Sequence, residues 1–148
     1  SPAMTEIEAG YVVHKDSTFQ RTEEVDAKGV KIAAPEKAGY ELYLTSTLKN
    51  ASIFRTKNFS ESIEIFNQSK VDALSGLKPN LIDSMHKLPK GKLLDGNFMT
   101  VNHGFAISIG KDAANAYLHS FVKELIATGF VARSIEKHQI KGLIAIQK

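Results

Sequence analysis

The 148-residue sequence contains no cysteine, which excludes a disulfide framework and a thiolate metal site. It contains no apolar run long enough to span a bilayer. Runs of like charge are also missing, because the 19 basic and 16 acidic residues are interspersed and leave a net charge of +3. We therefore expect no nucleic-acid partner. What remains is an ordinary globular composition, 43% hydrophobic and 24% charged, with enough length for one core or two small lobes.

Motifs of catalysis and metal binding are missing as well. The five histidines are scattered without the spacing of a metal site, and no phosphate-binding or nucleophile motif occurs. We predict no catalytic residue, no metal site and no cofactor. Asn102 and His103 are the exception among the scattered polar residues, because they precede a predicted strand, where a polar pair suits a binding pocket.

Strand and helix patterns alternate along the chain. Short connections between them imply βαβ units, and hence an α/β fold with a mostly parallel sheet flanked by helices. The β-forming runs predict strands at 10–14, 30–34, 53–55, 71–74 and 105–109. Apolar spacing predicts helices at 40–48, 80–86, 112–128 and 131–138. A further helix is predicted to begin after an N-cap at Ser60.

Two short loops follow predicted strands and lead directly into predicted helices. They are 35–39 and Ser75-Gly76-Leu77-Lys78, and each contains a lysine. Ligands of open α/β sheets bind beyond the carboxyl ends of strands, against helix N-termini, so either loop could hold an anionic group. The alternative is that both are simple turns. The candidate ligand-binding residues are Lys37, Ala38, Gly39, Ser75, Gly76, Lys78, Asn102 and His103.

Three stretches together resemble one family. They are "GYVVHKDSTFQRTEEVDAKGVKIAAPEKAGYELYLTSTL", "SESIEIFNQSKVDALSGLKP" and "HGFAISIGKDAANAYLHSFVKELIATGFVARSIEKHQIKG". In this order and spacing they resemble the second lobe and C-terminal helices of bacterial extracellular solute-binding proteins of family 3. These are the amino-acid-type periplasmic receptors of ABC transporters.

The resemblance implies a periplasmic-binding-protein type II-like fold with an incomplete second lobe. It assigns residues 9–102 to lobe 2 and residues 103–148 to the returning C-terminal segment of lobe 1. The start at Ser1, without a signal peptide or most of lobe 1, makes us expect a fragment. The apolar stripe of the helix at 112–128 would then lack its usual cover, and we expect a homodimer or a segment-swapped oligomer.

The same resemblance implies a periplasmic receptor that closes around a small solute and delivers it to an ABC permease. Leu77 stands where the family has an aspartate for an α-amino group, so a small polar or anionic solute fits better than an ordinary amino acid. Three alternatives stay open: a ligand-sensing domain of a signalling receptor, the effector domain of a LysR-type regulator, and an enzyme like periplasmic cyclohexadienyl dehydratase, with Glu36 as its acid.

Overall fold

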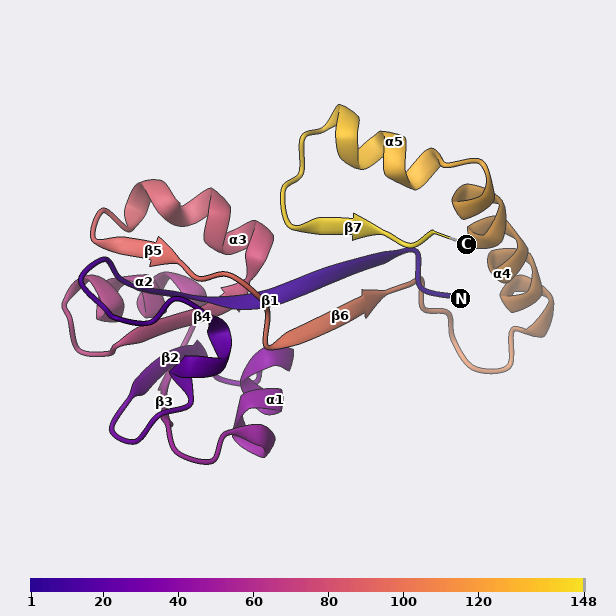
Figure 1. Ribbon diagram of the computed structural model, residues 1–148. Coiled ribbons are helices and arrows are strands. Elements are labelled where there is room, and N and C mark those ends of the chain that lie inside the picture. Colours follow the sequence, from indigo (N-terminus) through magenta and orange to yellow (C-terminus); the bar gives the residue numbers. More distant parts are fainter. Residues whose placement is uncertain (148) are drawn as a thin grey trace. The chain divides into compact units, whose positions relative to one another are not determined.

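The computed structural model describes residues 1–147 and divides into two compact units (Figure 1). The central unit is Glu8–Met99, and the terminal unit combines Ser1–Ile7 with the described residues from Thr100 onward. The predicted boundary between 102 and 103 falls three residues later than this division, and Lys148, the end of the predicted second segment, lies outside the described residues.

Strands and helices alternate through the chain much as the sequence pattern predicts. The strands are β1 (Thr5–His14), β2 (Lys31–Pro35), β3 (Ser52–Thr56), β4 (Ala73–Leu77), β5 (Gly91–Leu93), β6 (Met99–His103) and β7 (Leu143–Ala145). The α-helices are α1 (Gly39–Thr47), α2 (Phe59–Asn67), α3 (Lys78–Asp83), α4 (Asp112–Ala127) and α5 (Phe130–Lys137), and the 3-10 helices are η1 (Thr22–Val25) and η2 (Ser84–Lys87).

The sheet of the central unit has the strand order β3-β2-β4-β1-β5. β2 pairs in parallel with both β3 and β4, whereas β1 pairs antiparallel with β4 and β5. β2, β3, β4 and β5 therefore all run in the same direction, as predicted for a mostly parallel sheet, and β1 runs in the opposite one. The reason is connectivity, because α1 and α2 are crossover helices between parallel strands while β1 reaches β2 through η1 without one.

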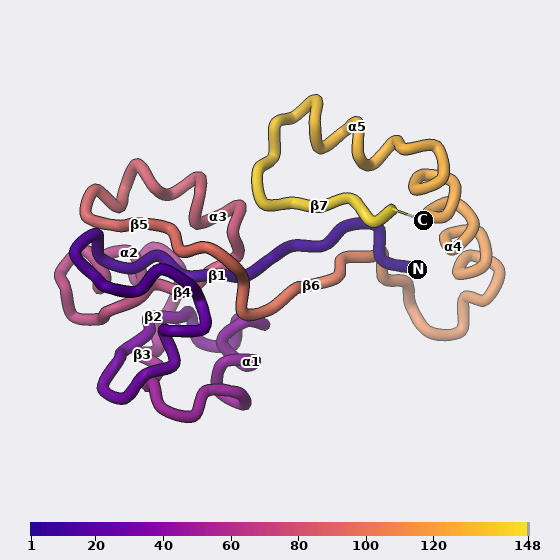
Figure 2. The backbone as a smooth tube through the Cα atoms, viewed as in Figure 1, coloured from indigo at the N-terminus to yellow at the C-terminus, as the bar shows by residue number. Residues whose placement is uncertain are grey.

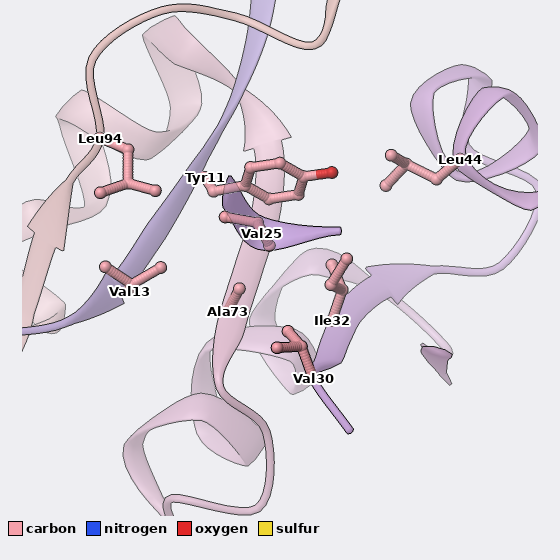
Figure 3. Close-up of a cluster of buried hydrophobic side chains, with 8 residues drawn as sticks. All are labelled: Tyr11, Val13, Val25, Val30, Ile32, Leu44, Ala73 and Leu94. Carbon is pink, nitrogen blue, oxygen red and sulfur yellow. The ribbon is translucent and has the colours of Figure 1, made fainter. Parts of the chain in front are cut away.

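Both faces of this sheet are buried. On one face Tyr11, Val13, Ile32 and Ala73 pack with Leu44 of α1 (Figure 3). The other face carries the neighbouring strand residues and is covered by α2 and α3; its buried side chains are Val12, Ala33, Ile63, Phe66, Val71, Leu74, Leu81 and Leu88. Two covered faces explain why the strands read as continuous apolar runs instead of alternating ones.

β4 is longer than the sequence indicates. It was predicted to end at residue 74, but Ser75 and Gly76 are strand residues, and the antiparallel ladder with β1 runs on to the pair Ala9–Leu77. The expected loop is thus wrong, because this ladder satisfies the backbone groups up to the point where α3 begins at Lys78.

The N-terminus of α2 also differs from its prediction. Ser60 was expected as the N-cap, but Asn58 takes that position and its side chain accepts a hydrogen bond of 2.9 Å from the backbone N–H of Glu61. Both residue types cap helices well, and the structure uses the earlier one.

In the terminal unit, β7 pairs antiparallel with the first part of β1, and Gly129 separates α4 from α5 in a left-handed conformation (φ +68°). Figure 2 follows the chain from β6 through α4 and α5 into β7. The strand predicted at 105–109 is wrong: no strand among the described residues pairs with this segment, so its backbone lacks a ladder. Among the helices of residues 1–147, none is both long and apolar enough to cross a membrane.

Candidate functional site

Six of the eight predicted site residues lie at one edge of the central sheet, here called the carboxyl edge. β2 and β4 end there, and α1 and α3 begin there. Because β1 runs the opposite way, its residue Glu8 reaches the same edge beside the Ala9–Leu77 pair. The edge combines helix N-termini with a few charged groups, which is the usual setting of a ligand site in such sheets.

A buried carboxylate shapes the loop before α1. The Glu41 side chain is 3% exposed and receives hydrogen bonds from the backbone N–H of Lys37 (3.1 Å), the Thr45 hydroxyl (2.8 Å) and Arg55 Nε (2.9 Å). Burial alone would raise the pKa of Glu41, but these bonds and the Arg55 charge lower that pKa below its usual value. The carboxylate is therefore ionised and holds the loop in one conformation.

The Lys37 side chain itself is exposed. Its backbone has φ +66°, a left-handed conformation that non-glycine residues adopt rarely. Within residues 1–147 its ammonium group has no hydrogen-bond or ion-pair partner. Ala38 is half-buried behind it and Gly39 begins α1. Lys37 thus offers a positive charge that has no ion-pair partner among residues 1–147, beside the N-terminus of α1.

Ser75 and Gly76 are buried and face the interior of the central unit. The Ser75 side chain is fully buried, and its hydroxyl donates to the backbone oxygen of Ala33 at 2.8 Å. A Cβ atom on Gly76 would lie 3.0 Å from side-chain atoms of Leu81 and Phe59. The glycine therefore makes room for α2 and α3 on β4.

Lys78 is an internal counter-ion. Its ammonium contacts Glu8 Oε2, and Asn97 Nδ2 donates to Glu8 Oε1 at 2.9 Å. The Lys78 and Glu8 side chains are 16% and 25% exposed. Each oxygen of the carboxylate thus has a partner within the central unit. This pair was not predictable from the sequence, because its partners lie 70 residues apart and meet only through the β1–β4 register.

An apolar patch accompanies these charges at the carboxyl edge. Buried Tyr40 packs with half-buried Leu77, Phe98 and Met99, and Phe98 stacks on Tyr43 with ring centroids 6.3 Å apart. Burial raises the pKa of Tyr40 to about 12, so its phenol stays protonated at physiological pH. Tyr43 keeps 38% of its surface exposed, so the patch is open to solvent in part.

Asn102 and His103 lie on β6 in the terminal unit, not in the central unit, and both are exposed. The backbone oxygen of His103 accepts a hydrogen bond of 2.8 Å from Met4 N–H, which ties β6 to the start of the chain.

A hollow of about 820 Å³ lies at the opposite edge of the central sheet. His14 forms part of its wall, with its ring stacked on Phe66 (centroids 4.2 Å apart) and Nε2 3.0 Å from the Val71 backbone oxygen. Its lining combines both signs of charge: His14, Lys15, Asp16, Ser17, Thr18, Phe19, Val30, Ser69, Val71, Asp72, Pro89 and Lys90. Sequence reasoning missed it. We place the candidate site at the carboxyl edge, where helix N-termini and the uncompensated Lys37 lie together.

Comparison with known proteins identifies the fold of the chain. No protein-family model matches the sequence, and no curated protein matches it. Solved structures do match. A lysine complex of a protein described as a binding component of an ABC transporter from Wolinella succinogenes has a TM-score of 0.78, at 16% identity over 92% of this chain and 60% of its own. The chain has the fold of amino-acid-binding proteins of ABC transporters.

Two further structures agree with that fold. An amino acid ABC transporter substrate-binding protein from Streptococcus pneumoniae, bound to L-arginine, has a TM-score of 0.71 at 19% identity over 93% of this chain and 58% of its own. An ancestral amino-acid-binding protein, a precursor of cyclohexadienyl dehydratase, also has a TM-score of 0.71, at 23% identity over 93% of this chain and 59% of its own. The chain therefore spans about 60% of these neighbours' length, which makes the α/β unit described here a partial one.

Proposed function

We propose that the chain is part of an extracytoplasmic solute-binding receptor of an ABC importer, and that it binds a small polar or anionic solute between two lobes that close about a hinge. The observation that carries this proposal is the fold shared with amino-acid-binding proteins over more than nine-tenths of the chain. Residues 9–102 would form lobe 2, and residues 103–148 the returning segment of lobe 1. The periplasm and a permease partner follow from the same reading.

Lys37 would be the residue that attracts an anionic solute. Its ammonium is exposed and unpaired among the described residues, whereas Lys78 is neutralised by Glu8. Gly39 and Ala38 would contribute backbone groups. The role of Asn102 and His103 in binding stays a prediction from the sequence. Ser75 and Gly76 would support the site through packing, because their atoms face the interior.

A solute screen followed by one substitution tests the proposal. Thermal-shift measurements on the chain with amino acids, 2-oxo acids and sugar acids should find at least one stabilising solute. Lys37→Gln should weaken binding of an anionic hit by about 1.5–3 kcal/mol, the range for a hydrogen bond to a charged group. Lys28→Gln, at an exposed lysine before β2 and thus at the opposite edge of the sheet, is the control and should leave affinity unchanged. A screen without any hit, or equal losses in both variants, would contradict the proposal.

An enzyme is the second candidate, because one structural neighbour is a precursor of cyclohexadienyl dehydratase. A dehydratase needs an acid to protonate the leaving hydroxyl. Glu36 is the exposed carboxylate on the loop before α1, whereas Glu8 and Glu41 are held by partners. Conversion of prephenate by the chain, abolished in Glu36→Gln, would favour this candidate. Prephenate that stays intact over hours would remove it.

A further inference from the structure

The Glu8–Lys78 pair has a consequence for the chemistry of the solute. Resting on the proposed function, we infer that the solute presents no ammonium or guanidinium group to the central unit, and that an apolar group of the solute packs on the patch formed by Leu77, Phe98, Met99 and Tyr43. An amine-free carboxylic acid with an apolar side chain fits this description.

Neighbouring residues contact both members of the Glu8–Lys78 pair. Glu8 Oε2 contacts the Lys78 ammonium and Oε1 accepts from Asn97, so the charge of the carboxylate is already balanced within the protein. The methylenes of Lys78 lie across Gly10, with Cε 3.5 Å and Cγ 3.6 Å from the position that a Cβ there would take. The Lys78 side chain thus lies along β1 beside Glu8.

Replacement of the Lys78 ammonium by a solute ammonium does not increase the number of ion pairs. A solute ammonium that displaced Lys78 would form one ion pair and break another, and it would leave the Lys78 charge, which is 16% exposed in the pair, without its partner. The other carboxylates at the helix starts of this edge do not compensate. Glu41 is buried in its own network, Glu61 accepts from the Lys57 backbone N–H at 2.6 Å, and Glu36 is exposed, where water and salt screen its charge. An amine-free solute leaves the pair intact.

The apolar patch beside the ion pair offers a surface for an uncharged part of the solute. Leu77 lies directly beside the pair in the chain and in the β1–β4 ladder, and it packs in one cluster with Phe98 and Met99. Tyr43 extends the cluster to solvent through its stack on Phe98. Burial of an apolar solute group against this patch is favourable in proportion to the area removed from water.

Matched pairs of probes test the inference on the 148-residue chain. Leucine, phenylalanine, glutamine and arginine are each compared by calorimetric titration with the 2-oxo acid of the same side chain. We expect the apolar 2-oxo acids to bind at least about tenfold more tightly than their amino acids. The reason is that the ammonium of an amino acid would lose its contacts with water and find no free carboxylate in return. Amino acids that bind as tightly or more tightly overturn the inference and leave the proposed function standing. If no member of either class binds, the inference fails, and the proposed function fails as well only if the wider screen finds no other solute.

A gain of binding gives a second test. Lys78→Met keeps most of the side-chain volume and frees Glu8, so the affinity for leucine should rise about tenfold or more. The double variant Glu8→Gln/Lys78→Met removes both charges and should show no rise. A folded Lys78→Met chain with unchanged affinity for leucine, or an equal rise in the double variant, would refute the role of the pair. If Lys78→Met does not fold, the wild-type comparison decides alone.

Discussion

At the scale of single residues, the lysines of the two predicted ligand loops have different surroundings. Lys37 is exposed and unpaired among the described residues, whereas Lys78 lies against Glu8 and Asn97. From the sequence alone both are predicted to bind the ligand, because each lies in a loop between a predicted strand and a predicted helix. What separates them is the strand register, which brings Glu8 to Lys78 and leaves Lys37 alone.

Glu41 should make stability depend on pH. Its folded-state pKa is lowered, so its contribution is present above the ordinary carboxyl pKa of 4.5 and is lost as pH falls through the folded pKa. We expect Glu41→Gln to lower the free energy of unfolding by about 2 kcal/mol at pH 7, with a smaller difference from wild type below pH ~4. Urea unfolding over this pH range measures it. Glu64→Gln, on the exposed face of α2, should change little; equal effects of both variants would contradict this role of Glu41.

The left-handed backbone of Lys37 should cost stability. Lys37→Gly relieves a φ of +66° and is expected to raise the free energy of unfolding by about 1 kcal/mol, whereas Lys37→Ala keeps the strain. Urea unfolding of both variants is the measurement. Equal stability of the two would show that the loop carries no strain.

At the scale of elements, the alternation of strands and helices was predictable, and several ends were not. The helix at 40–48 and the break at Gly129 follow from local spacing and match α1 and the α4–α5 junction. The extension of β4 to Leu77 depends instead on pairing with β1, which local pattern does not report. The alternating residues at 105–109 show the reverse case, because their pattern suits a strand but no partner strand among the described residues lies beside them.

Gly76 should be required for packing between β4 and its helices. Gly76→Ala places a methyl group 3.0 Å from Leu81 and Phe59, and we expect a loss of about 1–3 kcal/mol of stability. Gly39→Ala is the matched control, because nothing lies within 4 Å of its Cβ position and alanine favours the helix. Thermal unfolding compares the two. A tolerated Gly76→Ala would contradict the packing role.

At the scale of the whole molecule, the buried apolar side chains are unevenly shared. Nearly all of them belong to the central unit, while Val122 and Val131 are the buried hydrophobic residues of the described part from Thr100 onward. On α4, Tyr117 and Phe121 stack on each other (centroids 6.1 Å apart) but remain 71% and 38% exposed. The self-association expected from the sequence stays a prediction, with this face of α4 as its proposed contact.

Self-association should depend on that face. The chain should form dimers at rising concentration in sedimentation velocity runs, and Phe121→Glu should reduce them, because a charge in an apolar contact is costly. Leu42→Glu, at an exposed leucine of α1, is the control and should leave the dimer unchanged. A monomer at all concentrations would refute the prediction.

The most direct test of the proposed function is to locate the bound solute on the chain. In a ¹⁵N-labelled sample titrated with the best solute of the screen, the proposal predicts amide shifts at residues 37–40 and at Leu77, on the carboxyl edge of the central sheet. Amides around His14 and Ser17, beside the hollow at the opposite edge, should stay unchanged. Shifts confined to that hollow, or no shifts at saturating solute, would contradict the account.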